Sequence, residues 1–315
     1  MVRIKKILCP IDFSDFSHRA FDRAVAIARS HTAALTVLHV VPVQLDTAIL
    51  PYVEPESLGP FALPDVDRGR IVRELQQFLA IDHSLGVPVA FEVTEAPHVH
   101  EEILLHAERL PADLVVMGTH GRSGFQRLML GSVTEKVLRK TRPPVLTVPR
   151  AVSDVIPAGR TPFERVLCAV DFSECSIAAF RYAVALAKES HARLAAVHVV
   201  ELAPPLYDPL VGPAIDLPGY RSACEIVGRE RLRNVIPVAV RKATGVEEFV
   251  ACGKPHHEIL RVAEEWRSDL IVLGVHGRNV ADRMLFGSTV EPVVRRAPCP
   301  VLTVRAEARA ASAAA

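Results

Sequence analysis

The chain has little of what marks several classes of protein. Its 315 residues include one Trp, only 5% aromatic residues, and six cysteines without a C-x-x-C pair. Sparse cysteines in a chain of this length predict reduced, mostly buried thiols in the cytoplasm, not a disulfide framework. No stretch approaches the roughly 18 consecutive apolar residues of a membrane-spanning helix. The first apolar run ends before Asp12 and Asp15, so we expect no secretory signal.

An excess of one charge is also missing. The 37 basic and 36 acidic residues leave a net charge of +1, which provides no field to attract nucleic acid or an anionic membrane. Neither a G-x-x-x-x-G-K-[ST] loop nor a G-x-G-x-x-G loop after the first strand is present. No nucleophile–base pair or pair of carboxylates stands at a defined spacing. We therefore expect no catalytic residues.

What the chain does have is an internal repeat. Asp12–Ala28 and Asp171–Ala187 are identical at 10 of 17 positions, and Gly118–Val148 and Gly274–Val304 at 15 of 31. The length and the repeat predict two domains, at 1–149 and 163–305. The Pro-containing stretch 150–162 reads as a linker, and the Ala-rich tail 306–315 reads as disordered.

Within each copy, short apolar runs alternate with segments of helical periodicity. In the first copy, the first expected helix follows Ser14 or Ser17 as its cap. Three further helices are expected over Val66–Leu85, Val99–Leu110 and Ser132–Lys140. The alternation predicts a parallel sheet covered on both faces. The runs that we interpret as strands are Ile7–Ile11, Leu35–Val41, Val87–Val93, Leu114–Met117, Val145–Val148, Val166–Val170, Leu194–Val200, Val246–Val250, Leu270–Leu273 and Val301–Val304.

An acid follows the first strand of each copy, as Asp12 and Asp171. Parallel sheets bind ligands at the carboxyl ends of their strands, where the winding direction reverses. A carboxylate there can accept hydrogen bonds from a ribose hydroxyl or an adenine amine. Alternatively, it only stabilises the start of the next helix.

A glycine-rich loop follows the fourth strand of each copy. After Met117 come Gly118, Gly121, Gly131 and Ser132, and the second copy has Gly274, Gly277, Gly287 and Ser288 at the same spacing. Peptide N–H groups of such a loop and of the following helix start form an anion site suited to a di- or triphosphate. Alternatively, these glycines only form a tight turn after the strand and cap the next helix. Within the loops, His120, Arg122 and Arg278 either contact phosphate or serve only the loop and the solvent.

These residues resemble the universal stress protein family, whose signature is G-x2-G-x9-G-[ST]. His39-Val40, His198-Val199, the acid followed by Phe-Ser, and the final P-V-L-x-V also resemble the family. The resemblance implies two five-stranded α/β domains of strand order 3-2-1-4-5 that pair through their last strands, with a further homodimer possible. For one branch of the family, it also implies that ATP binds without strong catalysis.

Residue by residue, the resemblance implies adenine and ribose contacts in both copies, at Pro10, Asp12, Val40, Asp171 and Val199. It implies phosphate contacts at Gly118, Gly121, Gly131, Ser132, Val133, Gly274, Gly277, Gly287, Ser288 and Thr289. Ala169 replaces the proline in the second copy, and Asn279-Val280 replaces Ser123-Gly124, so the first site is the better match.

The function we expect is that of a cytoplasmic regulatory or stress-resistance factor that responds to nucleotide occupancy, through the glycine loops and the Pro-rich segments after each second strand. Asp12 could hold Mg²⁺ together with the phosphates, and we interpret His98, His100, His256 and His257 as solvated residues, not metal ligands. Two alternatives stay open. One is an interaction scaffold of the same fold that binds no nucleotide, and the other is a weak ATPase.

Overall fold

The computed structural model describes residues 4–43, 86–121, 130–149, 161–201, 217–275 and 288–306, and residues 69, 71, 73, 74 and 78 individually. Most of the helix expected over Val66–Leu85, both Pro-rich segments, the linker and the tail lie outside these residues. The domain limits therefore stay a prediction.

The first half of the chain alternates strands and helices as expected. Ser14, not Ser17, caps the first helix, because its side chain accepts a hydrogen bond from the Ser17 amide. The described strands are β1 (Lys6–Ile11), β2 (Ala34–Pro42), β3 (Val89–Ala96), β4 (Leu114–Gly118) and β5 (Val145–Val148). The helices are α1 (Asp15–His31), α3 (Val99–Arg109) and α4 (Ser132–Lys140).

The second half repeats this series, and Ser173 caps α5 as Ser14 caps α1. Its strands are β6 (Arg165–Ala169), β7 (Arg193–Val200), β8 (Glu247–Cys252), β9 (Leu270–Gly274) and β10 (Val301–Val304). Its helices are α5 (Glu174–Ser190), α6 (Leu217–Val235), α7 (Val238–Thr244), α8 (Pro255–Glu265) and α9 (Val290–Arg296). The short helix α7, which ends at Gly245 in the left-handed conformation, is not among the expected elements.

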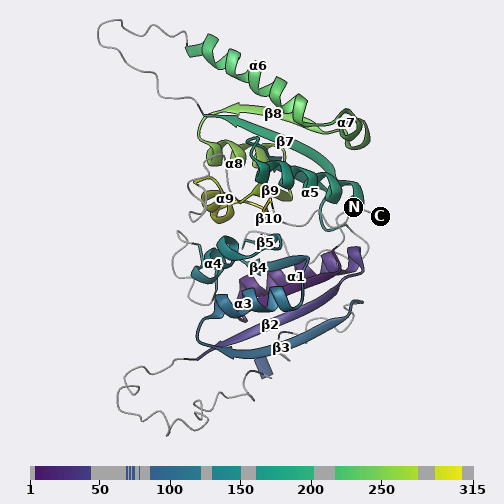
Figure 1. Cartoon of the computed structure of the whole chain (residues 1–315), viewed down its shortest axis with the longest axis vertical. Coiled ribbons are helices and arrows are strands. Elements are labelled where there is room, and N and C mark those ends of the chain that lie inside the picture. The colour runs from purple at the N-terminus through teal and green to yellow at the C-terminus, as the bar shows by residue number, and fades with distance from the viewer. Residues whose placement is uncertain are drawn as a thin grey trace, which may run out of the picture.

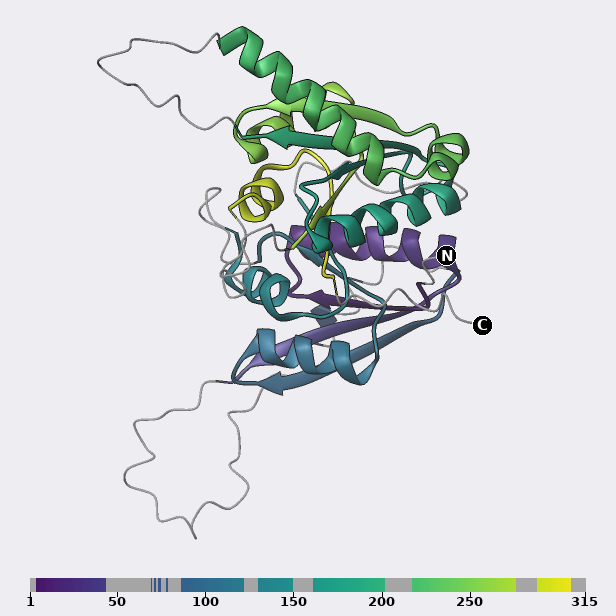
Figure 2. The same ribbon diagram turned by 45° about the horizontal axis from the view of Figure 1, so that its top comes forward.

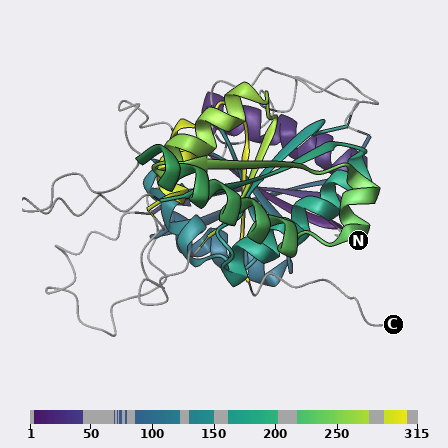
Figure 3. The same ribbon diagram turned by 90° about the horizontal axis from the view of Figure 1, so that it is seen from above.

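The ten described strands form one sheet, in the order β3-β2-β1-β4-β5-β10-β9-β6-β7-β8 (Figure 1). Each half has the order 3-2-1-4-5 with parallel neighbours, so the implied fold is confirmed. Seen from above, the strands fan out around the view axis (Figure 3), as the twist of a sheet this wide requires.

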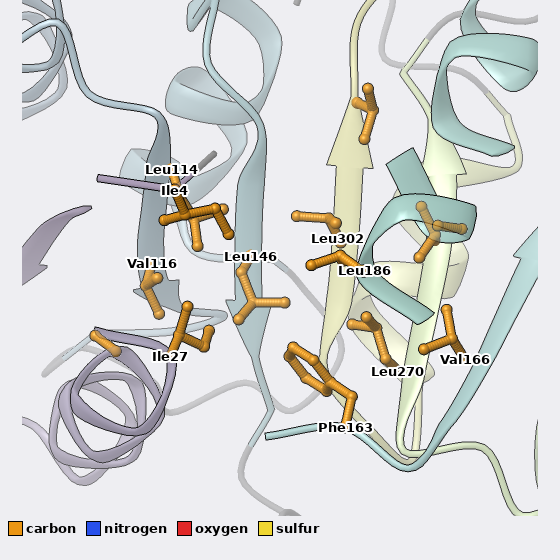
Figure 4. Packing of buried hydrophobic residues seen from close by; sticks show 14 of the residues in the cluster. Ile4, Ile27, Leu114, Val116, Leu146, Phe163, Val166, Leu186, Leu270 and Leu302 are labelled. Carbon is orange, nitrogen blue, oxygen red and sulfur yellow. The ribbon is translucent and has the colours of Figure 1, made fainter. Parts of the chain in front are cut away.

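The halves meet at β5 and β10, the one antiparallel pair among the described strands. Leu146 lies opposite Leu302 in this register, and both side chains lie between the two strands in Figure 4. Thr147 donates its hydroxyl to the Val301 carbonyl at 3.1 Å, and Thr303 donates to Val145 at 3.3 Å. These reciprocal contacts give the two copies a pseudo-two-fold relation.

Helices cover both faces of the sheet, as the side chains of β1 illustrate. Ile7 and Cys9 point to the face covered by α1, whereas Leu8 points to the face covered by α3 and α4. The first face continues across the domain boundary under α5, which lies beside α1 (Figure 2). The second continues under α8 and α9. Each core cluster therefore draws on both halves of the chain.

Candidate functional site

The carboxyl ends of β2, β1 and β4 meet at one edge of the sheet, because these strands are parallel neighbours. The chain winds from β1 toward β3 on one side and from β4 toward β5 on the other, so this edge contains the point where the winding reverses. Such a crevice is where α/β sheets bind ligands. The structure brings Asp12, Val40 and the first glycine loop to it.

Asp12 stands directly after β1 and is oriented by the cap of α1. Its Oδ1 accepts hydrogen bonds from the Ser14 amide at 3.1 Å and the Ser14 hydroxyl at 2.6 Å. Asp171 repeats this arrangement, with Ser173 at 2.9 and 2.6 Å. The acid therefore belongs to a helix start, as one expectation holds. It also stands at the edge where sheets of this class bind ligands, and a ligand contact there stays a prediction.

The residue after each acid has an unusual backbone. Phe13 has φ of 60° and Phe172 has φ of 67°, a left-handed conformation that costs a residue with a Cβ about 1–2 kcal/mol. The Phe13 ring lies 4.5 Å from the His39 ring, and the Phe172 ring lies 4.4 Å from the His198 ring. Nothing in the sequence marks these two positions as strained.

The first glycine of the loop has a packing role that the sequence does not reveal. A Cβ on Gly118 would lie 2.7 Å from Cβ of Phe16, and one on Gly274 would lie 2.6 Å from the backbone of Cys175 and Ser176. Glycine at these positions therefore lets the first helix of each copy approach the end of the fourth strand. The approach of an anion that the motif predicts at this glycine stays a prediction.

The second glycine brings the loop against the acid. A Cβ on Gly121 would lie 2.4 Å from Oδ2 of Asp12. The third, Gly131, donates its amide to the Thr119 carbonyl at 3.0 Å, and Thr134 donates its hydroxyl to the Gly118 carbonyl at 2.9 Å. These bonds attach the start of α4, at Ser132, to the end of β4. The start of α4, where the first N–H groups of a helix have no partner within the helix, thus lies beside the loop that Gly121 brings to Asp12.

His120 contributes to the loop itself. Its Nδ1 lies 3.0 Å from the Thr119 hydroxyl, and its ring centroid lies 5.1 Å from that of Phe16. Its Nε2 is buried and has no hydrogen-bond partner among the described residues. The Nδ1 atom therefore serves the loop, which is one of the two roles expected of this histidine. Contact with phosphate, the other role, stays a prediction.

The remaining predicted site residues differ in how they can act. The side chains of Val40 and Met117 are 6% and 4% exposed and belong to the core, and Pro10 is buried within β1, so these residues offer a ligand only backbone. Val133 and Val199 are partly buried against the same cluster. Arg122, Gly277, Arg278 and Gly287 lie outside the described residues. Ser288 and Thr289 precede α9, which begins two residues later than α4 does in its copy.

Cys9 and Cys168 are fully buried beside the site, and burial raises their pKa well above the ordinary value. Thiols in that state are packing residues. None of the six cysteines is in a disulfide in the part of the chain that the structure describes. No group of three His, Cys, Asp or Glu in the described parts of the chain is placed to hold a metal ion. His100 corrects one expectation: it is 9% exposed, not solvated, and burial, Lys136 and Lys140 lower its pKa.

Comparison with known proteins agrees with this geometry. The model of the universal stress protein family matches residues 3–149 and again 162–305. The chain belongs to the universal stress protein family. The universal stress protein Mb2028c of Mycobacterium bovis is 28% identical over 289 residues, which cover 86% of this chain and 87% of that one. The universal stress protein MJ0531 of Methanocaldococcus jannaschii is 30% identical over 157 residues, covering 49% of this chain and 89% of that one.

A universal stress protein from Archaeoglobus fulgidus has the same fold. Its crystal structure matches with a TM-score of 0.64 at 24% identity, over 96% of this chain and 99% of that chain. The tandem organisation of this universal stress protein is therefore found in solved and curated relatives. Among its described residues, no helix is long and apolar enough to cross a membrane.

Proposed function

We propose that this universal stress protein binds ATP at the carboxyl edge of β1, β2 and β4, and that occupancy of the site regulates its interactions. The observation that carries the proposal is the meeting of three parts in the first copy. Gly121 abuts the Asp12 carboxylate, and α4 begins beside the same loop. A carboxylate next to a helix start and a row of peptide amides suits a ribose joined to a polyphosphate.

Each part of the site would contact a different part of the nucleotide. On this proposal Asp12 accepts a hydrogen bond from a ribose hydroxyl, and the backbone of Pro10 and Val40 borders the adenine. Peptide groups of Gly118, Gly121, Gly131, Ser132 and Val133 hold the phosphates, with the backbone of Met117, His120 Nε2 and Arg122 beside them.

Magnesium fits the same donors. Mg²⁺ is usually bound by one or two carboxylates together with nucleotide phosphates, and Asp12 is the carboxylate at this site. The ion would neutralise part of the phosphate charge. Asp12 is the one protein ligand that we propose for the ion.

The second copy would bind nucleotide in the same way, with less support. Asp171 and Gly274 repeat the geometry of Asp12 and Gly118, and Val199 corresponds to Val40. Gly277, Arg278, Gly287, Ser288 and Thr289 complete this proposed second site. Ala169 in place of Pro10, and a later helix start, favour the first site as the stronger one.

We propose a regulatory role and not an enzymatic one. The oriented oxygen of Asp12 is held by Ser14 in a helix-cap arrangement, which Asp171 and Ser173 repeat in the second copy. Six cysteines without a disulfide among the described residues fit a reducing compartment such as the cytoplasm. Regulation would act through a protein partner or a second copy of the chain that distinguishes the two occupancy states.

The most direct test of the ligand is mass analysis of what denatured, purified protein releases. ATP is expected at up to two molecules per chain. Release of another mononucleotide would revise the identity of the ligand, and release of none, together with no heat when ATP is added, would favour the scaffold alternative.

Asp12→Asn tests the acid. This substitution keeps the size of the side chain but weakens its acceptor, so we expect ATP affinity at the first site to fall about tenfold or more, because hydrogen bonds to charged groups contribute about 1.5–3 kcal/mol. Isothermal titration calorimetry measures the change. Asp15→Asn is the matched control, since Asp15 is exposed in the first turn of the same helix. Equal losses in the two variants would show a general charge effect instead.

A phosphate-release assay on the same samples separates binding from turnover. We expect the rate to stay near the uncatalysed background for both the wild type and Asp12→Asn. A rate that is well above background and falls in Asp12→Asn would show that the protein is a weak ATPase.

A further inference from the structure

A histidine near the carboxyl end of the second strand of each copy contacts the end of the first strand. His39 Nδ1 lies 2.9 Å from the Ile11 carbonyl oxygen, and His198 Nδ1 lies 2.8 Å from the Val170 carbonyl oxygen. A carbonyl only accepts, so Nδ1 carries the proton and donates in both cases. The carbonyl that accepts belongs to the peptide group whose nitrogen is that of Asp12 or Asp171.

The same histidine ring supports the strained residue on the other side of the acid. Phe13 and Phe172 have positive φ, and their rings lie against His39 and His198. Each acid therefore stands between a peptide group held by Nδ1 and a phenylalanine held by the imidazole face. A conformation that costs free energy persists only where its surroundings enforce it.

The arrangement of histidine, acid and phenylalanine is the same in the two copies, but the residues that surround it differ. In the first copy the outer neighbour of Phe13 is Phe78, with ring centroids 5.9 Å apart. In the second copy the Arg231 guanidinium lies 4.3 Å from the Phe172 ring. The hydrogen bond from histidine and the left-handed phenylalanine are retained under either neighbour, as is the serine on the acid's Oδ1.

We propose that His39 and His198 are positioning residues for nucleotide binding, which rests on the function proposed above. They do not contact the ligand. His39 fixes the peptide group before Asp12 and the turn after it, so that the carboxylate faces Gly121 and the ribose before ATP arrives. Without the imidazole, binding would have to order this corner, and affinity would fall.

A double-mutant cycle tests the proposal. In the wild-type background, His39→Ala should weaken ATP binding at the first site about three- to tenfold, the size expected for one hydrogen bond. In the Asp12→Asn background the same substitution should have little further effect, because the histidine acts through the acid. Calorimetric titration of the four proteins gives the cycle.

Two further variants separate positioning from general stability. His39→Asn places an amide donor where Nδ1 was, so it should recover most of the affinity. His106→Ala is the matched control: His106 Nδ1 also lies 3.0 Å from a backbone carbonyl, that of Glu102 in α3, and its loss should leave ATP affinity unchanged. The corresponding pair His198→Ala and His198→Asn repeats the test in the second copy if His39→Ala does not fold.

The outcomes distinguish this inference from the proposed function. If the wild-type protein binds no ATP, the proposed function fails. If the wild type binds ATP and His39→Ala binds it equally well, the positioning role is wrong. Equal losses from His39→Ala with and without Asp12 would also overturn it, because the histidine would then act independently of the acid.

Discussion

At the scale of single residues, Gly118 and Gly121 belong to one loop but have different structural roles. Gly118 is needed where α1 crosses the end of β4, since a side chain would meet the backbone and Cβ of Phe16. Gly121 is needed where the loop meets Asp12. Both belong to the same motif in the sequence, which shows their spacing but not the surfaces that they face. A substitution at Gly118 is therefore a test of packing and a poor test of phosphate binding.

Gly118→Ala should lower the free energy of unfolding by about 1–3 kcal/mol, because the added methyl group overpacks the contact between α1 and β4. Urea denaturation measures the change. Gly245→Ala is the comparison, because Gly245 has φ of 59° but nothing within 4 Å of a Cβ. Backbone strain alone should lower the free energy of unfolding of this variant by only about 1 kcal/mol. A loss at Gly118 smaller than that at Gly245 would contradict the packing role.

At the scale of elements, the apolar runs were sufficient to predict all ten described strands, and their alternation with helical segments predicted that the sheet is parallel within each half. The order of the strands was implied only by the family resemblance. Strand signals are this clear because a parallel sheet is buried on both faces. Helix α7 was missed, since Val238–Thr244 is a short segment after Pro237 without a full helical period. The burial of His100 and the left-handed Phe13 were missed as well. Both depend on contacts with residues distant in sequence, which a local pattern does not contain.

The C-terminal ends of α1 and α5 meet at a histidine. His31 Nδ1 lies 3.5 Å from Glu189 Oε2 across the domain boundary, which favours the imidazolium. Burial, and next Lys5, nevertheless lower the pKa of His31 below its ordinary value of 6.5. The folded state therefore prefers the neutral ring more strongly than the unfolded state does, and this preference stabilises the fold at neutral and higher pH.

The resulting stability is lost as pH falls below about 6.5, where the unfolded chain takes up the proton first. The free energy of unfolding of the wild type should therefore decrease more between pH 7.5 and pH 5.5 than that of His31→Gln, which cannot titrate. Chemical denaturation at several pH values measures both. Parallel pH profiles for the two proteins would contradict the assignment.

At the scale of the whole molecule, the two copies behave as one body in the structure. Core clusters cross the boundary, and β5 pairs with β10 around Leu146 and Leu302. Arg305, just after β10, donates to the carbonyls of Leu138 and Arg139 at the end of α4. The first copy has Pro149 at the position equivalent to Arg305, so it has no such side chain to offer α9. The family resemblance implies the pairing of the last strands but not this asymmetry.

Leu302→Ala should lower the free energy of unfolding by about 2–5 kcal/mol, because it leaves a cavity where both halves pack. Leu302 is 2% exposed. Differential scanning calorimetry should show a single transition shifted to lower temperature. Leu105→Ala is the matched control, since Leu105 is 38% exposed on α3 and its loss should cost under about 0.5 kcal/mol. A second transition that keeps the wild-type temperature would show that the halves unfold independently.

The central claim is that a nucleotide lies at the carboxyl edge of β1, β2 and β4. A crystal structure of the protein grown with ATP and Mg²⁺ tests it most directly. We expect the triphosphate between the Gly118–Gly121 loop and the start of α4, with a ribose hydroxyl on the Asp12 carboxylate. Nucleotide bound elsewhere, or this edge empty at saturating ATP, would contradict the account.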